Sequence, residues 1–504
     1  MLRASAVRRN LAVATMSKRA LAAEYAVRGK IAIRANEIEA ELAKGGDAAK
    51  QFGFSSLIKL NTGNPQNHEQ KPWTFPHQVC ALLEAPELLE NGTAAQVFPA
   101  DVVERAKYVQ KQTAGQLGGY TATKGFGFIR KAIAEFIEKR DNASVGSTLR
   151  SVDPEDIFLS NGASGSVTPL LTGLVDSAKD GVMIPIPQYP LYTAQLALLG
   201  GTVVPYYLDE AKGWGVTPEQ LEESYDKATQ KGINVRAITV INPGNPTGQV
   251  LDAAVMRGIV EFAHRKNIVV LSDEVYQENI YAAGKKFHSM REIVLGMGEP
   301  YAKEVQLFSF HSASKGIHGE CGRRGGYLEL LNFPADVFQA FVKLPSINLC
   351  PNIMGQLMMD MIVKPPAPGQ PSYESYRKEY DTLFAGLKRR AKTLPEQLRK
   401  VPGITCNDIE GAMYAFPRIR LPQRYIDEAK AKGKAPDAVW CMGLVEQEGV
   451  VTIPGSGFGQ VEGTYHFRTT ILPPDEDMQD VARRIDAYQR RIIMKYGPVA
   501  DSKL

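Results

Sequence analysis

The chain has 504 residues, with 59 Lys and Arg against 55 Asp and Glu, which gives a formal net charge of +4. Hydrophobic residues make up 44% and charged residues 23%, a composition that excludes disorder, collagen repeats and a coiled coil. So small a charge over this length gives no indication of nucleic acid as a partner. The length predicts about two or three domains.

Membrane spans and metal sites are not expected either. The sequence has no run of about 18 apolar residues, the length that a membrane span needs. The five cysteines are widely spaced without a CxxC pair, and the seven histidines include no HExxH. We therefore predict neither a disulfide framework nor a metal site.

The two ends of the chain resemble targeting signals. Residues 1–23 contain basic residues and no acid, a composition similar to a mitochondrial transit peptide. A frayed basic terminus is the alternative, and Met16 offers a second start. The last three residues, Ser502–Leu504, match the peroxisomal address SKL. We expect the mitochondrial matrix or the peroxisome, or a division between them with a cytosolic fraction.

The expected elements begin with a helix over residues 20–43. Between about residues 153 and 331, short β-branched runs alternate with helical stretches, which indicates βαβ units and a mostly parallel sheet covered on both faces. A proline-rich connector at 364–371 is the strongest internal boundary, and a charged helix over 373–401 follows it. Strands are expected at 182–186, 237–241, 268–271 and 305–310, and later at 413–416 and 466–471. A further strand is expected to end at Leu159, before residues 160–165.

Residues that can carry chemistry gather directly after these strands. Ligands of open α/β sheets bind outside the carboxyl ends of the strands, and we expect four neighbouring strand ends to meet here. Lys315 follows the strand at 305–310 and could form a Schiff base, although most lysines are surface groups. Asp273 could hold a pyridinium nitrogen or simply cap a helix. Residues 162–164 could bind phosphate through free N–H groups or form a plain helix cap.

Three motifs, in this order, resemble the pyridoxal 5'-phosphate (PLP)-dependent aminotransferases of fold type I. They are NPxNPTG at 242–248, which alone could be tight turns, DEVY at 273–276 and SxSKG at 312–316. Further segments narrow the resemblance to the alanine aminotransferase family, of class I/II, over residues 20–496. These segments are 61–66, 181–192, 318–327, 411–417 and 454–460.

The resemblance implies an α/β fold type I transferase with a mostly parallel central sheet flanked by helices. A smaller α+β domain would be built from the N- and C-terminal parts of the chain. The division expected from it is a presequence at 1–23, an N-terminal arm and part of the small domain at 24–95, a large PLP-binding domain at 96–368, a C-terminal small domain at 369–501 and the address at 502–504.

The resemblance also implies the cofactor, PLP, and a role for each residue that holds it. Lys315 would carry the cofactor and move the substrate proton, Asp273 would pair with the ring nitrogen, and Tyr276 would hydrogen-bond the 3′ oxygen. Either of two adjacent arginines could hold the phosphate, and we choose Arg324 over Arg323 because the family's RxGY ending fits 324–327. The remaining cofactor contacts would come from Tyr120, Ala163, Ser164, Tyr189, Asn245, Ser312 and Ser314.

The substrate and the partner subunit follow from the same resemblance. Arg468 would grip the substrate α-carboxylate through its planar guanidinium, helped by the backbone of Gly63 and by Asn245. Salt-bridging within a strand is the alternative role for Arg468. Tyr120 would reach the partner's site in a homodimer. No arginine stands out by motif for the second carboxylate of glutamate.

The implied activity is transamination between L-alanine with 2-oxoglutarate and pyruvate with L-glutamate, in a ping-pong sequence. The first alternative is a glutamate:glyoxylate or alanine:glyoxylate aminotransferase of peroxisomes, which the SKL ending favours. The others are a lyase of the aminocyclopropane-carboxylate synthase type and a regulator that keeps this domain as a sensor. The intact Lys315 and the lack of room for a DNA-binding module argue against the regulator.

Overall fold

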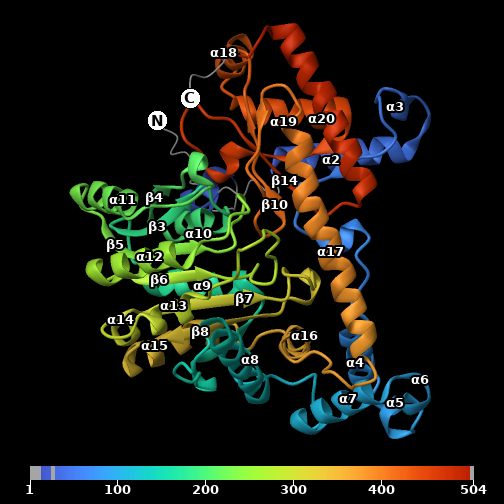
Figure 1. The fold of residues 1–504 in the computed structure, drawn as a ribbon, viewed down its shortest axis with the longest axis vertical. Coiled ribbons are helices and arrows are strands. Elements are labelled where there is room, and N and C mark those ends of the chain that lie inside the picture. Colours follow the sequence, from blue (N-terminus) through green and yellow to red (C-terminus); the bar gives the residue numbers. More distant parts are fainter. Residues whose placement is uncertain (1–12, 24–28, 500–504) are drawn as a thin grey trace, which may run out of the picture.

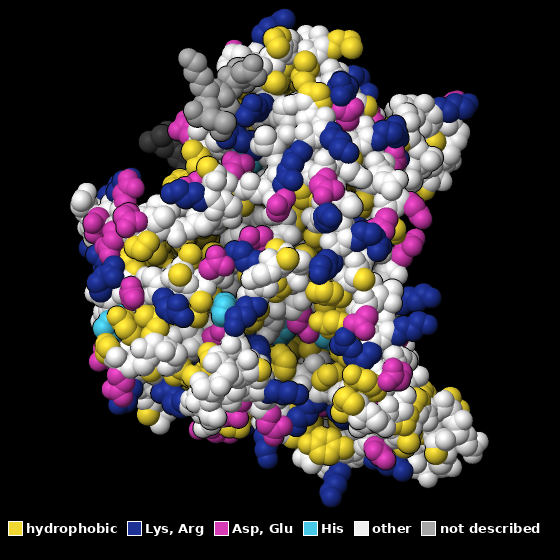
Figure 2. Space-filling view, in the orientation of Figure 1, with side chains coloured by type: hydrophobic (Ala, Val, Ile, Leu, Met, Phe, Trp, Pro, Cys, Tyr) yellow, Lys and Arg dark blue, Asp and Glu magenta, His cyan; other side chains and the backbone are white. Residues whose placement is uncertain are grey.

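Residues 13–23 and 29–499 are described by the computed structural model, shown in Figure 1. The expected address at 502–504 and the first half of the expected presequence lie outside these residues. Within the described ranges, no helix is long and apolar enough to span a membrane, and no cluster of three or more His, Cys, Asp or Glu could hold a metal ion. Basic and acidic side chains are intermixed over the face in Figure 2.

A seven-stranded sheet forms the centre of the large part of the molecule, in the order β2-β8-β7-β6-β5-β3-β4. Neighbouring strands are parallel, except that β8 is antiparallel to both β7 and β2. The predicted α/β fold with a mostly parallel sheet is therefore confirmed. The strands are β2 Ile157–Ser160, β3 Asp180–Ile186, β4 Thr202–Tyr207, β5 Asn234–Ile241, β6 Val269–Asp273, β7 Leu307–Ser312 and β8 Gly326–Leu331.

Helices cover both faces of this sheet, because successive side chains of each strand point to opposite faces. Val182 and Ile184 pack in one buried cluster, whereas Met183 between them packs in another. The first cluster joins the sheet to α9 Ala163–Leu174, α10 Leu191–Leu199 and α15 Ala335–Ser346. The second joins it to α11 Pro218–Gln230, α12 Ala253–Lys266, α13 Met290–Gly296 and α14 Tyr301–Glu304.

Two strands of the sheet were not predicted. Strand β4 contains Pro205 and lies at the edge of the sheet, where a missing N–H is tolerated. Strand β8 carries the buried Glu329, whose carboxylate accepts a hydrogen bond from Arg291 Nε at 2.8 Å. Because β8 lies between β2 and β7, the prediction of four neighbouring strand ends is wrong for β2.

A second group of helices lies below the sheet in Figure 1. Helix α4 packs against α7 and α16, and α16 packs against α8. The 26-residue helix α17, Tyr373–Leu398, follows the proline-rich connector and runs from this group to the upper part of the molecule. The helices of this group are α4 Thr74–Glu84, α5 Glu87–Glu90, α6 Ala94–Val97, α7 Ala100–Thr113, α8 Gly127–Val145 and α16 Ile353–Val363.

The upper part combines both ends of the chain, since β1 pairs in parallel with β12. Strand β14 lies between β10 and β13 and is antiparallel to both, and β9 pairs with β11. The domain boundaries at residues 95 and 368 stay predictions. The elements are α2 Lys30–Lys44, α3 Gly46–Lys50, β1 Ile58–Lys59, β9 Ile404–Thr405, β10 Tyr414–Ala415, β11 Arg418–Ile419, α18 Gln423–Ala431, α19 Pro436–Glu448, β12 Val450–Val451, β13 Ile453–Pro454, β14 Phe467–Thr470 and α20 Asp475–Tyr496.

The single helix expected over 20–43 is wrong. The described residues form α1 Lys18–Ala22 and α2, and Gly29 before α2 is extended, with φ −79° and ψ −163°. Glycine gains little from a helical conformation, so a break there is inexpensive. Arg19 Nη1 donates to the Leu199 carbonyl at 2.9 Å, so the end of the expected presequence contacts α10.

Candidate functional site

The ends of three parallel strands bring the predicted loops to one edge of the sheet. Asp273 is the last residue of β6 and lies in register with Ile241 of β5 and Phe310 of β7. The loop with Asn245 therefore starts on one side of Asp273, and the loop that leads to Lys315 starts on the other. The parallel order β5-β6-β7 explains why motifs far apart in the sequence share one site.

Lys315 is half-buried and lies against a loop from the N-terminal part of the chain. Its Nζ donates to the Gly63 carbonyl oxygen at 2.6 Å. The Gly63 loop follows β1, and the Thr470 N–H donates to the Leu60 carbonyl at 3.2 Å, which ties this loop to β14. Lys315 therefore lies between the large sheet and the strand that carries Arg468.

Gly63 is closely surrounded by site residues. A Cβ at this position would collide with the Tyr414 hydroxyl and lie 3.0 Å from Lys315 Nζ. We expect Gly63→Ala to displace one of these groups and to lower kcat/KM roughly 100-fold, the scale of a misplacement near 1 Å. Steady-state kinetics check this, with Gly53→Ala as the control because a Cβ at Gly53 would meet nothing within 4 Å. Equal kinetics for the two variants would contradict the prediction.

Asp273 is 5% exposed and has few partners for its carboxylate. Tyr192 Oη donates to Oδ2 at 2.8 Å, and the Val275 N–H lies 3.4 Å from Oδ1. Burial raises the Asp273 pKa to about 6, although the Tyr192 hydrogen bond and nearby Lys315 act in the opposite direction. A cation beside Asp273 would favour the ionised form.

The raised pKa of Asp273 predicts a pH-dependent cost in stability for the PLP-free protein. The folded protein holds this proton more tightly than the unfolded chain, so the benefit present below pH 4 is lost as the pH rises through about 6. A shift of about two pKa units corresponds to about 3 kcal/mol at most. We expect Asp273→Asn to raise the unfolding free energy of PLP-free protein at pH 8 and to leave it nearly unchanged at pH 4. Denaturant titration of both proteins at the two pH values measures this, and an equal difference at both would contradict it.

Arg468 lies on β14 and is 1% exposed. Its Nη1 donates to Asn245 Oδ1 at 3.1 Å, and its Nη2 donates to the Asn61 carbonyl at 2.6 Å. The guanidinium carbon lies 4.3 Å from the centre of the Tyr414 ring, and Nε has no hydrogen-bond partner among residues 13–23 and 29–499. In the part of the chain that the structure describes, no carboxylate forms an ion pair with Arg468. A buried guanidinium without an acid is suited to receive an anionic ligand.

Two tyrosine hydroxyls meet between Arg468 and Lys315. Tyr276 Oη donates to Tyr414 Oη at 3.1 Å, and both side chains are buried. Burial opposes ionisation of Tyr414, but the cations Lys315 and Arg468 outweigh burial and hold its pKa below the usual value. Burial and the neighbouring Tyr414 raise the pKa of Tyr276 well above its usual value, so the site favours negative charge on the Tyr414 oxygen and not on Tyr276.

Arg324 forms the centre of a second anion-binding arrangement. Its Nη1 donates to Ser314 Oγ and its Nη2 to Ser164 Oγ, each at 3.1 Å, at the first turn of α9. A Cβ at Gly162, before this helix, would lie 2.5 Å from Arg324 Nη2, so the close approach requires glycine. Arg323 contacts a different group, since its Nη2 lies 3.2 Å from His77 Nδ1. The free N–H groups of α9, two hydroxyls and a guanidinium together suit a phosphate.

The remaining predicted residues differ in how closely they join the site. Ala163 starts α9, and Ser312 Oγ donates to the Gly325 carbonyl at 3.1 Å behind Ser314. Tyr189 lies half-buried just before α10. Tyr120 is 81% exposed within one chain, in the loop between α7 and α8, and is not brought to the other site residues.

Sequence reasoning gave no role to several residues that contact the predicted ones, among them Asn61, Tyr192, Cys321 and Tyr414. Cys321 Sγ contacts the Ser314 carbonyl at 2.9 Å, beside Lys315. Tyr414 lies in the 411–417 segment, which was noted for the resemblance without a role for this hydroxyl. Tyr192 lies three residues after the predicted Tyr189, in the 181–192 segment, a proximity that could have indicated it.

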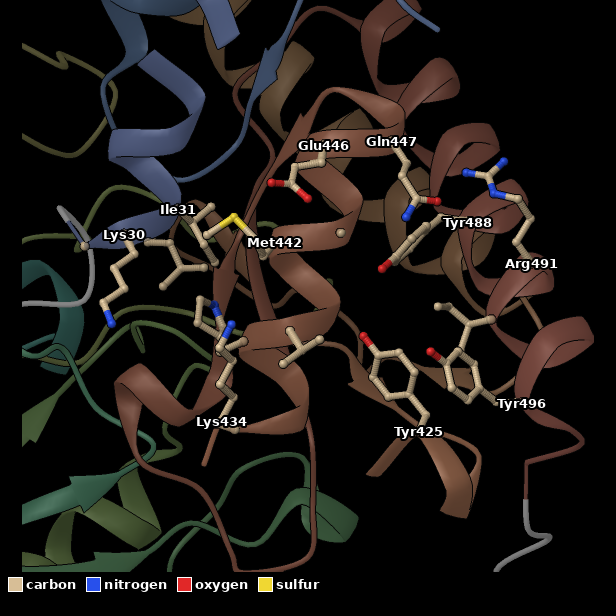
Figure 3. A pocket seen from close by; sticks show the side chains of 18 of the residues that line it. Lys30, Ile31, Tyr425, Lys434, Met442, Glu446, Gln447, Tyr488, Arg491 and Tyr496 are labelled. Atoms are coloured by element: carbon tan, nitrogen blue, oxygen red, sulfur yellow. The ribbon is translucent and has the colours of Figure 1, made fainter. Parts of the chain in front are cut away.

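A cavity of about 1000 Å³ lies away from Lys315, between α2, α19 and α20. Figure 3 shows Lys30, Met442, Tyr425 and Tyr488 around it. It reaches Asn61 but includes none of the predicted cofactor-binding residues. This cavity is therefore separate from the candidate site around Lys315.

Comparison with known proteins identifies the class. The pattern of the family described as aminotransferase class I and II matches residues 55–485, which is most of the chain. The chain belongs to this family and is an aminotransferase, as the motifs predicted.

Relatives narrow the assignment further. A probable mitochondrial alanine aminotransferase of Dictyostelium discoideum is 47% identical over 476 residues, which cover 94% of this chain and 88% of the relative. Glutamate–glyoxylate aminotransferase 1 of Arabidopsis thaliana is 43% identical over 482 residues, 96% of each chain. The solved alanine aminotransferase from Pyrococcus furiosus has a TM-score of 0.72 and 26% identity, covering 94% of this chain and 100% of that one. Within its class the chain is a member of the alanine aminotransferase family, and the predicted resemblance is confirmed.

Proposed function

We propose that the chain is a PLP-dependent transaminase that interconverts L-alanine and 2-oxoglutarate with pyruvate and L-glutamate by a ping-pong mechanism. The observation that carries this proposal is the buried Arg468 guanidinium, which has no carboxylate partner in the described residues and lies beside the Gly63 loop that meets Lys315. An α-carboxylate bound there would bring the substrate Cα toward the lysine.

The chain's residues fit PLP at each of its polar groups. Arg324, Ser164 and Ser314, with the first turn of α9, would hold the phosphate, since they already converge within 3.1 Å. Asp273 would meet the ring nitrogen, and Lys315 would react with the aldehyde. The other contacts proposed are Ala163, Tyr189, Asn245, Tyr276 and Ser312.

When bound, PLP supplies an aldehyde that captures amines and a protonated ring that withdraws electrons from the substrate Cα. Lys315 Nζ would accept the proton from the substrate Cα and hold it for return. Ionised Asp273 would keep the ring nitrogen protonated, and Tyr276 and Asn245 would hydrogen-bond the ring's 3′ oxygen. Arg468 and the Gly63 backbone hold the substrate carboxylate while this proton moves.

A glyoxylate-directed aminotransferase is the second candidate function. It is favoured by Arabidopsis relatives at 43% and 44% identity that are named glutamate–glyoxylate aminotransferases. Measuring kcat/KM of the purified protein for pyruvate and for glyoxylate, each with glutamate as the donor, tests the proposal. We expect pyruvate to be preferred, and a clear preference for glyoxylate would replace the main proposal with the alternative.

We also propose a homodimer in which Tyr120 completes the partner's site, which its 81% exposure in one chain supports. Tyr120→Ala subunits and Lys315→Ala subunits are mixed, refolded and assayed. If Tyr120 acts across the interface, each mixed dimer regains one complete site and activity rises above that of Tyr120→Ala alone. No rise in activity would overturn the shared-site proposal.

For location, we propose mitochondrial import directed by residues 1–23, with the C-terminal SKL sequence as a competing peroxisomal address. The Dictyostelium relative is named mitochondrial, which supports the first signal. A fluorescent tag at the C-terminus masks SKL, and a tag at the N-terminus masks the presequence. We expect mitochondrial fluorescence with the first tag, and cytosolic fluorescence there would contradict the proposal.

A further inference from the structure

The two oxygens of the Asp273 carboxylate have different surroundings. Oδ2 accepts a hydrogen bond from the Tyr192 hydroxyl at 2.8 Å, a normal O–H···O distance. Within the described part of the chain, the one donor to Oδ1 is the Val275 N–H, at 3.4 Å. One oxygen is therefore occupied by a strong donor from within the protein. The other oxygen, Oδ1, can accept a hydrogen bond from a bound ligand.

Tyr192 is held firmly enough to orient the carboxylate that it contacts. It is fully buried, on the first turn of α10, and packs in one core cluster with Ile184 and Leu271. Burial, reinforced by Asp273, raises the Tyr192 pKa well above its ordinary value. The hydroxyl therefore keeps its proton at working pH and acts only as a donor to Asp273.

We propose that Tyr192 is a positioning residue, which holds the Asp273 carboxylate in place and directs its free oxygen toward the ring nitrogen of the cofactor. This inference rests on the proposed PLP chemistry. Tyr189 lies three residues before Tyr192, and the Tyr192 N–H lies 3.4 Å from the Tyr189 carbonyl oxygen. One short segment thus supplies Tyr189, a proposed cofactor contact, and the Tyr192 hydroxyl that holds Asp273.

The other groups near Asp273 do not replace this contact. Lys315 acts on it only as a nearby charge, and Tyr276 directs its hydroxyl to Tyr414. Tyr192 is therefore the side chain that hydrogen-bonds Asp273 among the described residues. Removing this hydroxyl should leave the ionised carboxylate with a weak backbone donor alone.

The PLP-free protein gives a test that does not depend on catalysis. Tyr192→Phe should destabilise the fold more at pH 8, where Asp273 is ionised, than at pH 4.5, where it is protonated. The control is Tyr206→Phe, because Tyr206 is equally buried and its hydroxyl donates at 2.7 Å to a neutral group, the Thr239 carbonyl. Its effect should be the same at both pH values. In an Asp273→Asn background, the pH dependence of the Tyr192→Phe effect should vanish.

The PLP-loaded enzyme supplies the second test. Tyr192→Phe should weaken PLP binding and lower kcat by roughly tenfold each, the scale of one hydrogen bond to a charged group. KM for alanine should change little, since Arg468 holds the substrate carboxylate. Tyr206→Phe should change neither value.

Suppose that Tyr192→Phe and Tyr206→Phe show the same pH dependence of their stability loss, and the same PLP affinity and kcat. The inference about Tyr192 is then overturned, while the proposed function stands. If the wild-type protein takes up no PLP, the proposed function fails, and the cofactor role of Tyr192 fails with it. The pH experiment then still reports whether the two side chains interact in the folded protein.

Discussion

Replacing Lys315 with alanine is expected to abolish transamination, with a fall in kcat of roughly 10⁴-fold or more, because the same amine attaches the cofactor and moves the proton. The variant should still fold, since Lys315 is half-buried and the side-chain hydrogen bond that it loses is the one from Nζ to the Gly63 carbonyl. It should also bind PLP without a covalent link, through Asp273 and the Arg324 arrangement. The visible absorbance that PLP gives when attached to a lysine should therefore be lost.

The measurement combines an alanine–2-oxoglutarate assay with a PLP spectrum of each purified protein. Lys343→Ala, at an exposed position on α15, is the matched control and should keep both properties. Borohydride fixes PLP to the lysine that carries it, and peptide mass spectrometry of the wild type should identify Lys315. Substantial turnover by Lys315→Ala, or a label on another lysine, would end this assignment.

The parts of the site that the sequence predicts best are those carried by short continuous segments. NPxNPTG, DEVY and SxSKG each follow a strand, and β5, β6 and β7 end where these motifs begin or within them. A local motif fixes both its turn and its place at a strand end, so these positions need no knowledge of distant residues. The parallel arrangement of the strands then brings the motifs together.

Side chains that reach the site from distant segments were not predictable in this way. Tyr192 contacts Asp273 across 81 residues, and Tyr414 contacts Tyr276 across 138. The sequence around each tyrosine predicts an aromatic core residue. The packing of α10 and β10 is needed to show that each hydroxyl contacts a polar partner. The choice between Arg323 and Arg324 likewise depends on side-chain direction, because one lies beside His77 and the other between two serines.

Replacing Arg468 with lysine should impair recognition of the substrate carboxylate while it keeps the positive charge. The guanidinium offers two parallel donors in one plane, which an ammonium group cannot reproduce. The variant also loses one or both hydrogen bonds to Asn245 and to the Asn61 carbonyl. Removal of one partner of a buried charged contact typically costs about 3 kcal/mol of binding free energy. This cost corresponds to a fall in kcat/KM of roughly 100-fold.

The effect should depend on the presence of a carboxylate in the substrate. Alanine and glutamate should both show a raised KM with Arg468→Lys, whereas ethylamine, which has no carboxylate, should react at the same low rate with either protein. Arg483→Lys, at an exposed position on α20, controls for the substitution itself and should behave as the wild type. Thermal melting separates lost binding from lost folding. An unchanged KM for alanine in a folded Arg468→Lys protein would mean that another group holds the carboxylate, and the observation that carries the proposed function would have to be reassigned.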